Sequence, residues 1–259
     1  MKFLLSLIFT VVCNNKWNAQ AIDCPPNFDN LADDICTIIQ EETSDFCSAN
    51  DACHQMGLSR NLRVNLIGMN VTKIISWLKR SGSIYTSINK LLRPDQANRA
   101  GWRVGVPGQA NFMTQGNEMD LWDDDQPEDK REVVTAVKDG KLHDVTMEGF
   151  YYSALCEWAG RGSSILVASG IERFNAEFPE SMNDLFFRER QIVGCLEKRS
   201  AVTLIECAKI CKLEYRCRSF YFNAKMSKCY MALYVDSLLS LGDKAQSESH
   251  WVRYARPNW

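Results

Sequence analysis

Residues 122–129 read Trp-Asp-Asp-Asp-Gln-Pro-Glu-Asp, an acidic loop with a proline near its centre. A turn at Asp139-Gly140 and a short run from Leu142 to Met147 follow, and the apolar stretch before Glu157 contains Cys156. Crowding carboxylates without a cation is unfavourable, and calcium prefers oxygen ligands. The loop is therefore a candidate ligand or metal site, and a solvated acidic loop is the alternative.

The beginning of the chain has the pattern of an export signal. Met1-Lys2 is followed by an apolar run from Phe3 to Cys13 and by a polar stretch that ends Ala19-Gln20-Ala21. This pattern predicts a signal peptide over residues 1–21. The apolar run is shorter than the roughly 20 residues that a membrane span needs. We therefore expect a secreted, extracellular protein without a membrane span.

Charge and motifs exclude several function classes. The 259 residues carry a formal net charge of −2 with no basic stripe, which argues against nucleic acid as a partner. The three histidines, His54, His143 and His250, lie in no motif of a nucleophilic hydrolase or zinc protease. We expect a binding protein of one or two domains and not an enzyme.

Two helices are predicted in the first half of the chain. Ala49, Cys53 and Met56 recur at helical spacing, in a helix that starts near Ser48 and ends near Gly57. A second periodic segment predicts a helix from residue 71 to about residue 80.

The start of the second helix contains the sequon Asn70-Val71-Thr72. Asn70 is therefore a candidate glycosylation site, and the alternative is that its side chain caps the helix. The polar stretch 81–100 is interpreted as an insertion with a helical segment around Ile84, Ile88 and Leu91. Residues 101–106, Gly-Trp-Arg-Val-Gly-Val, predict an apolar core strand.

Several of these motifs together resemble a C-type lectin-like domain over residues 22–158. They are Cys24-Pro-Pro-Asn-Phe with Cys36, the strand 101–106 and the Gln-Pro-Glu loop. The resemblance implies an α+β fold of two helices packed on antiparallel sheets with a long loop. It also implies a cis proline in that loop and disulfides Cys24–Cys36 and Cys53–Cys156.

The same resemblance implies a calcium and sugar site in the acidic loop. His143 stands where the family has an amide oxygen, and imidazole is a poor ligand for this hard ion. Leu142 replaces a tryptophan, and Asp120, Asp123, Asp124, Asp125 and Asp129 offer substitute oxygens. The implied calcium ligands are Gln126, Glu128, Glu132 and Asp144, and the implied ligand-binding residues are Gln126, Pro127, Glu128, His143 and Asp144.

Two further features of this region are the replacement of a cysteine pair and a group of aromatic residues. Val134 and Met147 align with cysteines that the family usually joins beside the loop, so packing is expected to replace that bond. Four aromatic residues near the loop either contact a ligand or belong to the strand core: Trp122, Phe150, Tyr151 and Tyr152.

The second half of the chain has a different pattern. A Gly/Ser-rich break follows Trp158, residues 159–184 are interpreted as a connector, and residues 185–259 as a second domain. Thr203 and Glu206 form a capping-box motif before a helix. The cysteine spacing Cys207-x3-Cys211-x5-Cys217-x11-Cys229 resembles a PAN/apple domain, which implies Cys207–Cys229 and Cys211–Cys217. Zinc binding by these cysteines is the alternative.

Cys47 and Cys195 remain unassigned, one in each predicted domain. An interdomain disulfide, intermolecular pairing and free thiols are the alternatives. The whole sequence leads us to expect a secreted carbohydrate-recognition protein with glycans or glycoproteins as partners and calcium as its ion. The alternative is a calcium-independent interaction scaffold that also contacts extracellular proteins through its apple-like domain.

Overall fold

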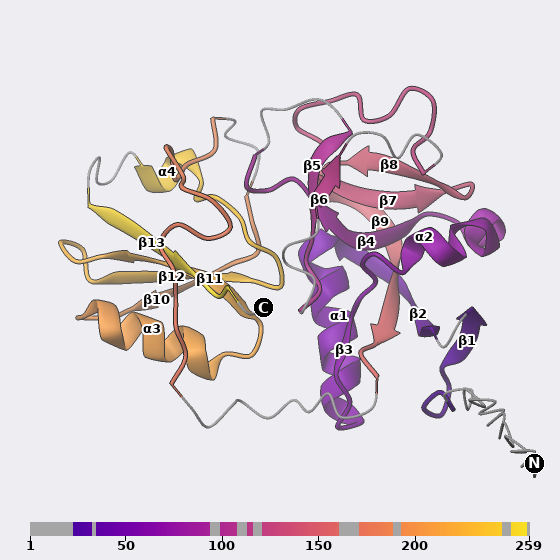
Figure 1. The fold of residues 1–259 in the computed structure, drawn as a ribbon, viewed down its shortest axis with the longest axis horizontal. Coiled ribbons are helices and arrows are strands. Elements are labelled where there is room, and N and C mark those ends of the chain that lie inside the picture. The colour runs from indigo at the N-terminus through magenta and orange to yellow at the C-terminus, as the bar shows by residue number, and fades with distance from the viewer. Residues whose placement is uncertain are drawn as a thin grey trace, which may run out of the picture.

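The computed structural model (Figure 1) is an α+β structure with two sheets side by side. It describes residues 23–32, 35–93, 99–107, 113–115, 121–160, 171–188, 193–244 and 250–257. The predicted signal peptide lies outside the described residues. Residues 23–158, here the N-terminal region, contribute a nine-stranded sheet, and residues 171–257, the C-terminal region, contribute a four-stranded sheet within the described parts.

The N-terminal sheet is organised by the pairing of two long strands. β2 (Ile35–Asp45) and β9 (Glu148–Trp158) run antiparallel with Thr37 opposite Glu157, so the two ends of this region meet. The other strands are β1 (Asp29–Ala32), β3 (Val64–Leu66), β4 (Ile84–Asn89), β5 (Ala100–Val104), β6 (Met113–Gln115), β7 (Val134–Lys138) and β8 (Lys141–Val145).

Helix α1 (Phe46–Ser59) begins earlier than the sequence predicted. The Asp45 carboxylate accepts the backbone N–H of Ser48 at 2.7 Å, so Asp45 is the N-cap and Ser48 lies inside the first turn. Gly57 lies inside the helix, and a Cβ there would come within 2.6 Å of the Leu62 carbonyl oxygen. The glycine therefore serves close packing and does not end the helix.

The second predicted helix is present in two parts. α2 (Val71–Ile74) continues directly into the 3₁₀ helix η1 (Ile75–Arg80). The side chain of Asn70 does not cap α2, because its amide donates to the carboxylate of Glu157. The capping alternative for Asn70 is therefore wrong, and its glycosylation stays a prediction.

The helical segment predicted around Ile84, Ile88 and Leu91 is wrong. Residues 84–89 form the central strand β4, and all six are buried. β4 pairs with β5, β7 and β9. A strand buried on both faces lacks the alternation that identifies strands, so apolar residues at helical spacing arise there by chance.

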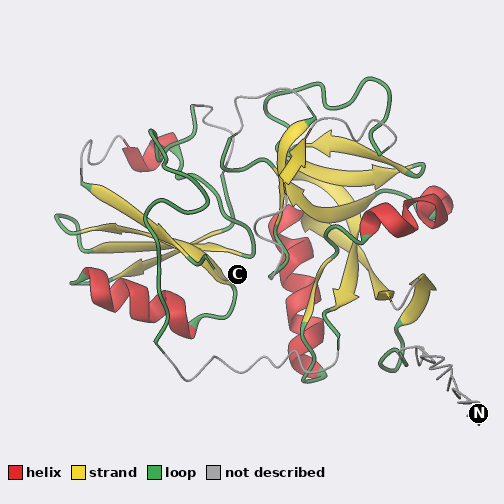
Figure 2. Cartoon of the chain, viewed as in Figure 1, coloured by secondary structure: helices red, strands yellow, loops and turns green. Residues whose placement is uncertain are grey.

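The C-terminal region packs one helix on its sheet (Figure 2). The strand order is β10-β12-β11-β13, and α3 (Leu204–Leu213) contacts β11. Thr203 caps α3, and the Glu206 carboxylate accepts the N–H of Val202 at 2.7 Å. The strands are β10 (Leu196–Ser200), β11 (Cys217–Asn223), β12 (Lys228–Leu233) and β13 (Trp251–Ala255), and the short helix is α4 (Leu241–Lys244).

Five disulfides hold the two regions. Cys47 pairs with Cys195, so the interdomain alternative holds and both residues are bonded within the chain. The other four bonds are those that the resemblances implied. They are Cys24–Cys36, Cys53–Cys156, Cys207–Cys229 and Cys211–Cys217. Because Cys207, Cys211, Cys217 and Cys229 are all disulfide-bonded, they are not zinc ligands.

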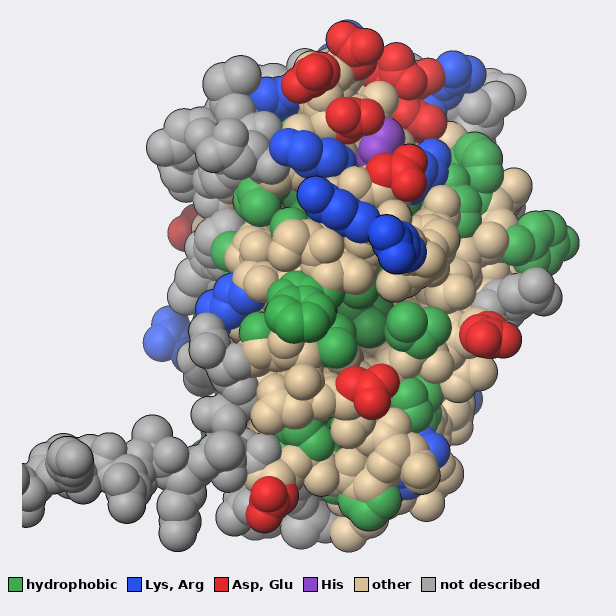
Figure 3. All heavy atoms as spheres, turned by 90° about the vertical axis from the view of Figure 1, so that its right-hand side faces the viewer, with side chains coloured by type: hydrophobic (Ala, Val, Ile, Leu, Met, Phe, Trp, Pro, Cys, Tyr) green, Lys and Arg blue, Asp and Glu red, His purple; other side chains and the backbone are tan. Residues whose placement is uncertain are grey.

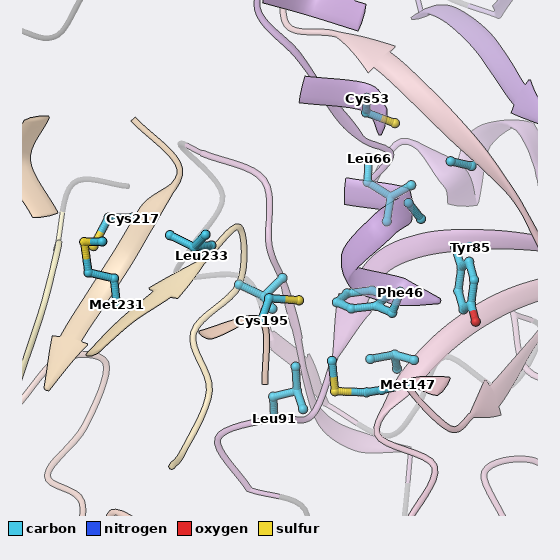
Figure 4. Close-up of a cluster of buried hydrophobic side chains, with 14 of the residues drawn as sticks. Phe46, Cys53, Leu66, Tyr85, Leu91, Met147, Cys195, Cys217, Met231 and Leu233 are labelled. Carbon is cyan, nitrogen blue, oxygen red and sulfur yellow. The ribbon is translucent and has the colours of Figure 1, made fainter. Parts of the chain in front are cut away.

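One apolar cluster continues across the boundary between the regions (Figure 4). Phe46 and Leu91 of the N-terminal region and Cys195 and Leu233 of the C-terminal region belong to it. The backbone N–H of Leu238 also donates to the Leu91 carbonyl at 3.2 Å. The contact therefore combines a covalent bond, shared burial and a backbone hydrogen bond.

A charged network borders this apolar cluster. Arg216 of the C-terminal region lies 2.8 Å from Glu214 and 3.4 Å from Asp51 of α1, and the hydroxyl of Tyr234 donates to Asp51. The ring of His54 stacks on Tyr215 at 5.7 Å between centroids. This charged network (Arg216, Glu214, Asp51, Tyr234) fixes α1 against the C-terminal region.

Candidate ligand-binding loop

The acidic loop, residues 121–132, is joined to β8 at its start. The N–H of Asp123 donates to the Leu142 carbonyl at 3.1 Å, and the N–H of Leu142 donates to the Leu121 carbonyl at 2.7 Å. Trp122 is buried between these contacts, with its ring 5.0 Å from that of Trp102. The loop therefore starts from the core and then turns outward.

The peptide bond Gln126–Pro127 is cis, as the resemblance implied. Glu128, which follows the proline, is exposed, whereas Gln126 is half-buried. In the space-filling view of Figure 3, acidic side chains gather at one end of the molecule, with lysine or arginine and histidine side chains beside them. The loop region therefore presents a concentrated but mixed charge.

Arg99 binds three backbone carbonyl oxygens of the loop. Its Nε donates to the carbonyl of Gln126 at 2.8 Å, and its Nη2 donates to the carbonyls of Asp123 and Asp124 at 2.9 and 3.0 Å. Hydrogen bonds from a guanidinium are charge-assisted and directional. This contact set, here the Arg99 clasp, gives the loop one shape through protein groups.

Asp144 joins the loop to β8 from the other side. Its buried carboxylate accepts the backbone N–H groups of Glu128 and Asp129 at 3.1 and 3.3 Å. The side-chain oxygen of Gln126 accepts the N–H of Asp144 at 3.2 Å. The structure therefore brings Gln126, Glu128 and Asp144 together, although Asp144 contacts the backbone of Glu128 and not its side chain.

Glu132 lies in an unfavourable electrostatic position. Burial and the neighbouring carboxylates of Asp144, Asp129 and Glu128 raise its pKa from 4.5 to about 7. Burial also raises the pKa of Asp144 from 3.8 to about 6, against the effect of its backbone hydrogen bonds. These two groups carry the electrostatic strain of the loop.

His143 and Asp129 have other partners. The Nε2 of His143 lies 3.4 Å from the Asp123 carboxylate, and burial followed by the charge of Lys138 lowers the pKa of His143. Asp129 is bound by the guanidinium of Arg131 at 2.5 Å, which lowers its pKa. Neither side chain is directed toward a shared centre with Glu132.

These contacts do not fit calcium as the loop stands. Calcium needs six to eight oxygens, and Asp144 and Asp129 are already engaged by N–H donors. Across the part of the chain that the structure describes, no three histidine, cysteine, aspartate or glutamate side chains converge on a position that suits a metal ion. Asp120, a suggested substitute ligand, lies outside the described residues.

The four aromatic candidates separate into two pairs. Trp122 and Tyr152 are buried, so they belong to the core. Phe150 and Tyr151 are exposed, Tyr151 with 76% of its surface accessible. Phe150 stacks on Tyr152 at 5.3 Å between centroids, so only its outer face is open to a ligand.

Two observations complete the site. Val134 and Met147, which replace a cysteine pair, are both buried in the same apolar cluster, as expected. Arg99 was missed by the sequence analysis because it belongs to no motif and precedes its loop partners by more than twenty residues. An arginine next to a predicted core strand is the only signal that the sequence offers.

One family model matches part of the C-terminal region. Residues 186–250 match the family model of the PAN domain. A search of the curated proteins finds no significant match. Within the described residues, no helix has the length and apolar character to cross a membrane.

Several solved structures are similar to about half of the chain. The carbohydrate-recognition domain of the mouse scavenger receptor C-type lectin has 17% identity and a TM-score of 0.39, with 52% of this chain and 94% of that chain covered. The C-type lectin CEL-I of Cucumaria echinata has 12% identity and a TM-score of 0.40, with 53% and 99% covered. Human lithostathine has 14% identity and a TM-score of 0.40, with 53% and 100% covered.

The PAN/apple resemblance of the second half is confirmed by the family model, which matches residues 186–250. C-type lectin-like domains are among the solved structures that are similar to about half of the chain. The α+β fold class with several disulfides also agrees with the expectation.

Proposed function

We propose that the protein is a carbohydrate-recognition protein that binds sugar hydroxyl groups directly through Gln126 and Glu128. The observation that carries this proposal is the Arg99 clasp, which holds three backbone carbonyls of the acidic loop through a protein side chain. A preformed loop loses little conformational entropy when a ligand binds. A C-type lectin-like region and a PAN domain also favour recognition over catalysis.

The chemistry of the loop suits a polyhydroxylated ligand. The exposed Glu128 carboxylate accepts hydrogen bonds from hydroxyl groups, and the amide nitrogen of Gln126 donates to them. Carboxylate acceptors make stronger hydrogen bonds than neutral ones.

Secretion belongs to the same proposal. Five disulfides within the described residues are typical of an oxidising compartment. A glycan at Asn70 remains part of the proposal, because the sequon is present and its side chain is only partly buried.

Calcium-dependent recognition is the second candidate. The raised pKa values of Glu132 and Asp144 favour it, because a bound cation would relieve the repulsion among these carboxylates. It requires that Asp144 release its backbone donors and turn toward an ion. Thermal unfolding with calcium and then with chelator separates the two candidates, because an ion that binds only the folded state raises the midpoint.

A protein-binding scaffold is the third candidate. The outer face of α3 and the turn before it expose Val202, Ile205 and Leu213 at 75%, 80% and 60% of their surface. Apolar side chains exposed along one helix are typical of a protein contact. This surface lies on the PAN domain and is separate from the acidic loop.

A glycan array with three proteins tests the proposed function. We expect wild type to bind a defined set of glycans in the presence of chelator. Glu128→Gln removes the charge and should weaken that binding about tenfold. Glu41→Gln is the matched control, because Glu41 is an exposed glutamate on β2 away from the loop. Equal binding by Glu128→Gln and wild type would refute the role of the loop.

A further inference from the structure

A pocket lies between the two regions, and neither Gln126 nor Glu128 lines it. It has a volume of about 370 Å³, within the roughly 300–1,000 Å³ of small-molecule sites. Its lining comes from both regions: Leu92 and Lys130 belong to the N-terminal region, and Phe186 and Leu238 to the C-terminal region. A pocket built by two regions exists only when both are docked.

The floor of the pocket is apolar and fixed. Leu92, Phe186 and Leu238 have only 4%, 8% and 5% of their surfaces exposed. Backbone hydrogen bonds anchor the segments beside them, from Leu238 N–H to the Leu91 carbonyl at 3.2 Å and from Phe187 N–H to the Leu239 carbonyl at 2.8 Å. The floor is therefore preformed for the apolar face of a ligand.

The rim of the pocket is cationic. Arg93, Lys130 and Arg188 line it from three separate segments. Arg93 is bound through two nitrogens by Glu180, at 2.8 and 2.6 Å. Among the ion pairs that join described residues, none involves Lys130 or Arg188. Their charges are therefore available to a ligand.

Acidic groups at the rim do not cancel this charge. Asp184 lines the pocket, and its carboxylate accepts the backbone N–H of Phe186 at 3.1 Å. Glu180, which is not a lining residue, is shared between Arg93 and Arg103, with its second contact at 3.1 Å. Three cationic side chains and one carboxylate thus line the pocket, which leaves a local excess of positive charge in a chain whose net charge is −2.

We propose that this pocket is a second binding site, for a small organic anion. Its carboxylate or sulfate group pairs with Lys130 and Arg188, and its apolar face covers Leu92, Phe186 and Leu238. This combination of a cationic rim and an apolar floor selects against neutral sugars and against cations. The site takes Lys130 from the acidic loop but none of the side chains proposed to bind sugar, and it requires no metal.

Calorimetric titration with matched probes tests this proposal. Octanoate offers a hydrocarbon body and glucose 6-sulfate a sugar body, and glucose is the neutral control. We expect at least one anion to bind with a dissociation constant below about 1 mM, while glucose gives no signal at this site. The anion that binds more tightly shows whether the apolar floor of the pocket prefers a hydrocarbon chain or a sugar ring.

Variants decide whether the signal comes from this pocket. Arg188→Glu and Lys130→Glu should each weaken anion binding about tenfold. Both residues are exposed, so these changes leave the fold intact, which the thermal midpoint checks. Lys209→Glu on α3, outside the pocket, is the matched charge control, and Glu128→Gln reports on the loop; both should bind octanoate as wild type does. Failure of both anions to bind, or binding that survives Arg188→Glu, would overturn the proposal.

Discussion

The charged network between the regions and the acidic loop both hold partly buried charges, but they balance them in opposite ways. In the charged network, the guanidinium of Arg216 binds Glu214, and this contact lowers the pKa of the Glu214 carboxyl. In the loop, burial and then repulsion by the neighbouring carboxylates raise the pKa of Glu132 to about 7. The first arrangement stabilises the folded chain, whereas the second costs stability.

This difference separates the roles of the two regions. Paired charges beside a disulfide and an apolar cluster make the contact between the regions a structural joint. Unbalanced charges at a solvent-facing loop are typical of functional sites, where strain is relieved by a ligand. Substitutions in each of the two arrangements should therefore change stability differently.

Loss of the interdomain disulfide should have the largest effect. Cys47→Ala with Cys195→Ala opens a loop that spans 148 residues. The chain-entropy model gives about 5 kcal/mol for such a loop, and the other disulfides already restrict the unfolded chain, so we expect a loss of about 3–4 kcal/mol. Urea unfolding followed by fluorescence measures it. A loss below about 1 kcal/mol would show that the disulfide is not central to the joint.

Arg216→Met should cost about 2 kcal/mol of unfolding free energy, because it leaves Glu214 and Asp51 partly buried without their cation. Arg131→Met is the matched control, because its pair with Asp129 is more exposed, and the expected loss there is below about 0.5 kcal/mol. Chemical denaturation of both variants measures the difference. Similar losses in the two would remove the distinction between the joint and the loop.

Glu132→Gln should stabilise the protein at alkaline pH. The folded state raises the pKa of Glu132 from 4.5 to about 7, so ionisation costs stability as pH rises through this window. Below about pH 4.5 both states are protonated, and the cost is absent. After allowance for solvent screening, we expect a gain of about 1 kcal/mol at pH 8 and none at pH 4.5.

Unfolding free energies of wild type and Glu132→Gln across this pH range test the sign. Glu41→Gln, at an exposed position, should follow wild type at every pH. A loss of stability in Glu132→Gln at pH 8 would mean that the carboxylate is stabilised in the folded loop, by a cation or by hydrogen bonds.

Some parts of the molecule were predictable from the sequence because they depend on local or covalent rules. The family resemblances implied the partners of eight cysteines and left Cys47 and Cys195 with an interdomain bond as one of three alternatives. The cis proline came from the resemblance. Thr203 caps α3 by accepting the backbone N–H of Glu206, three residues later, and a contact this local is recorded in a sequence motif.

Other parts depend on tertiary contacts that no local pattern records. β4 is buried from both sides by strands distant in sequence, so its periodicity misled the prediction. Asp45 was overlooked as the N-cap of α1 because Ser48 follows it with similar capping chemistry. Arg99 acts through backbone carbonyls, which every residue type carries, so its partners leave no trace in the sequence.

The most direct test of the account is the affinity for a selected glycan in chelator and in millimolar calcium. The Arg99 clasp predicts the same dissociation constant in both conditions, and a loss of about tenfold in Arg99→Ala, whose loop has no guanidinium to bind its three carbonyls. Binding that appears only in calcium, with Arg99→Ala equal to wild type, would contradict the account and assign the loop to an ion.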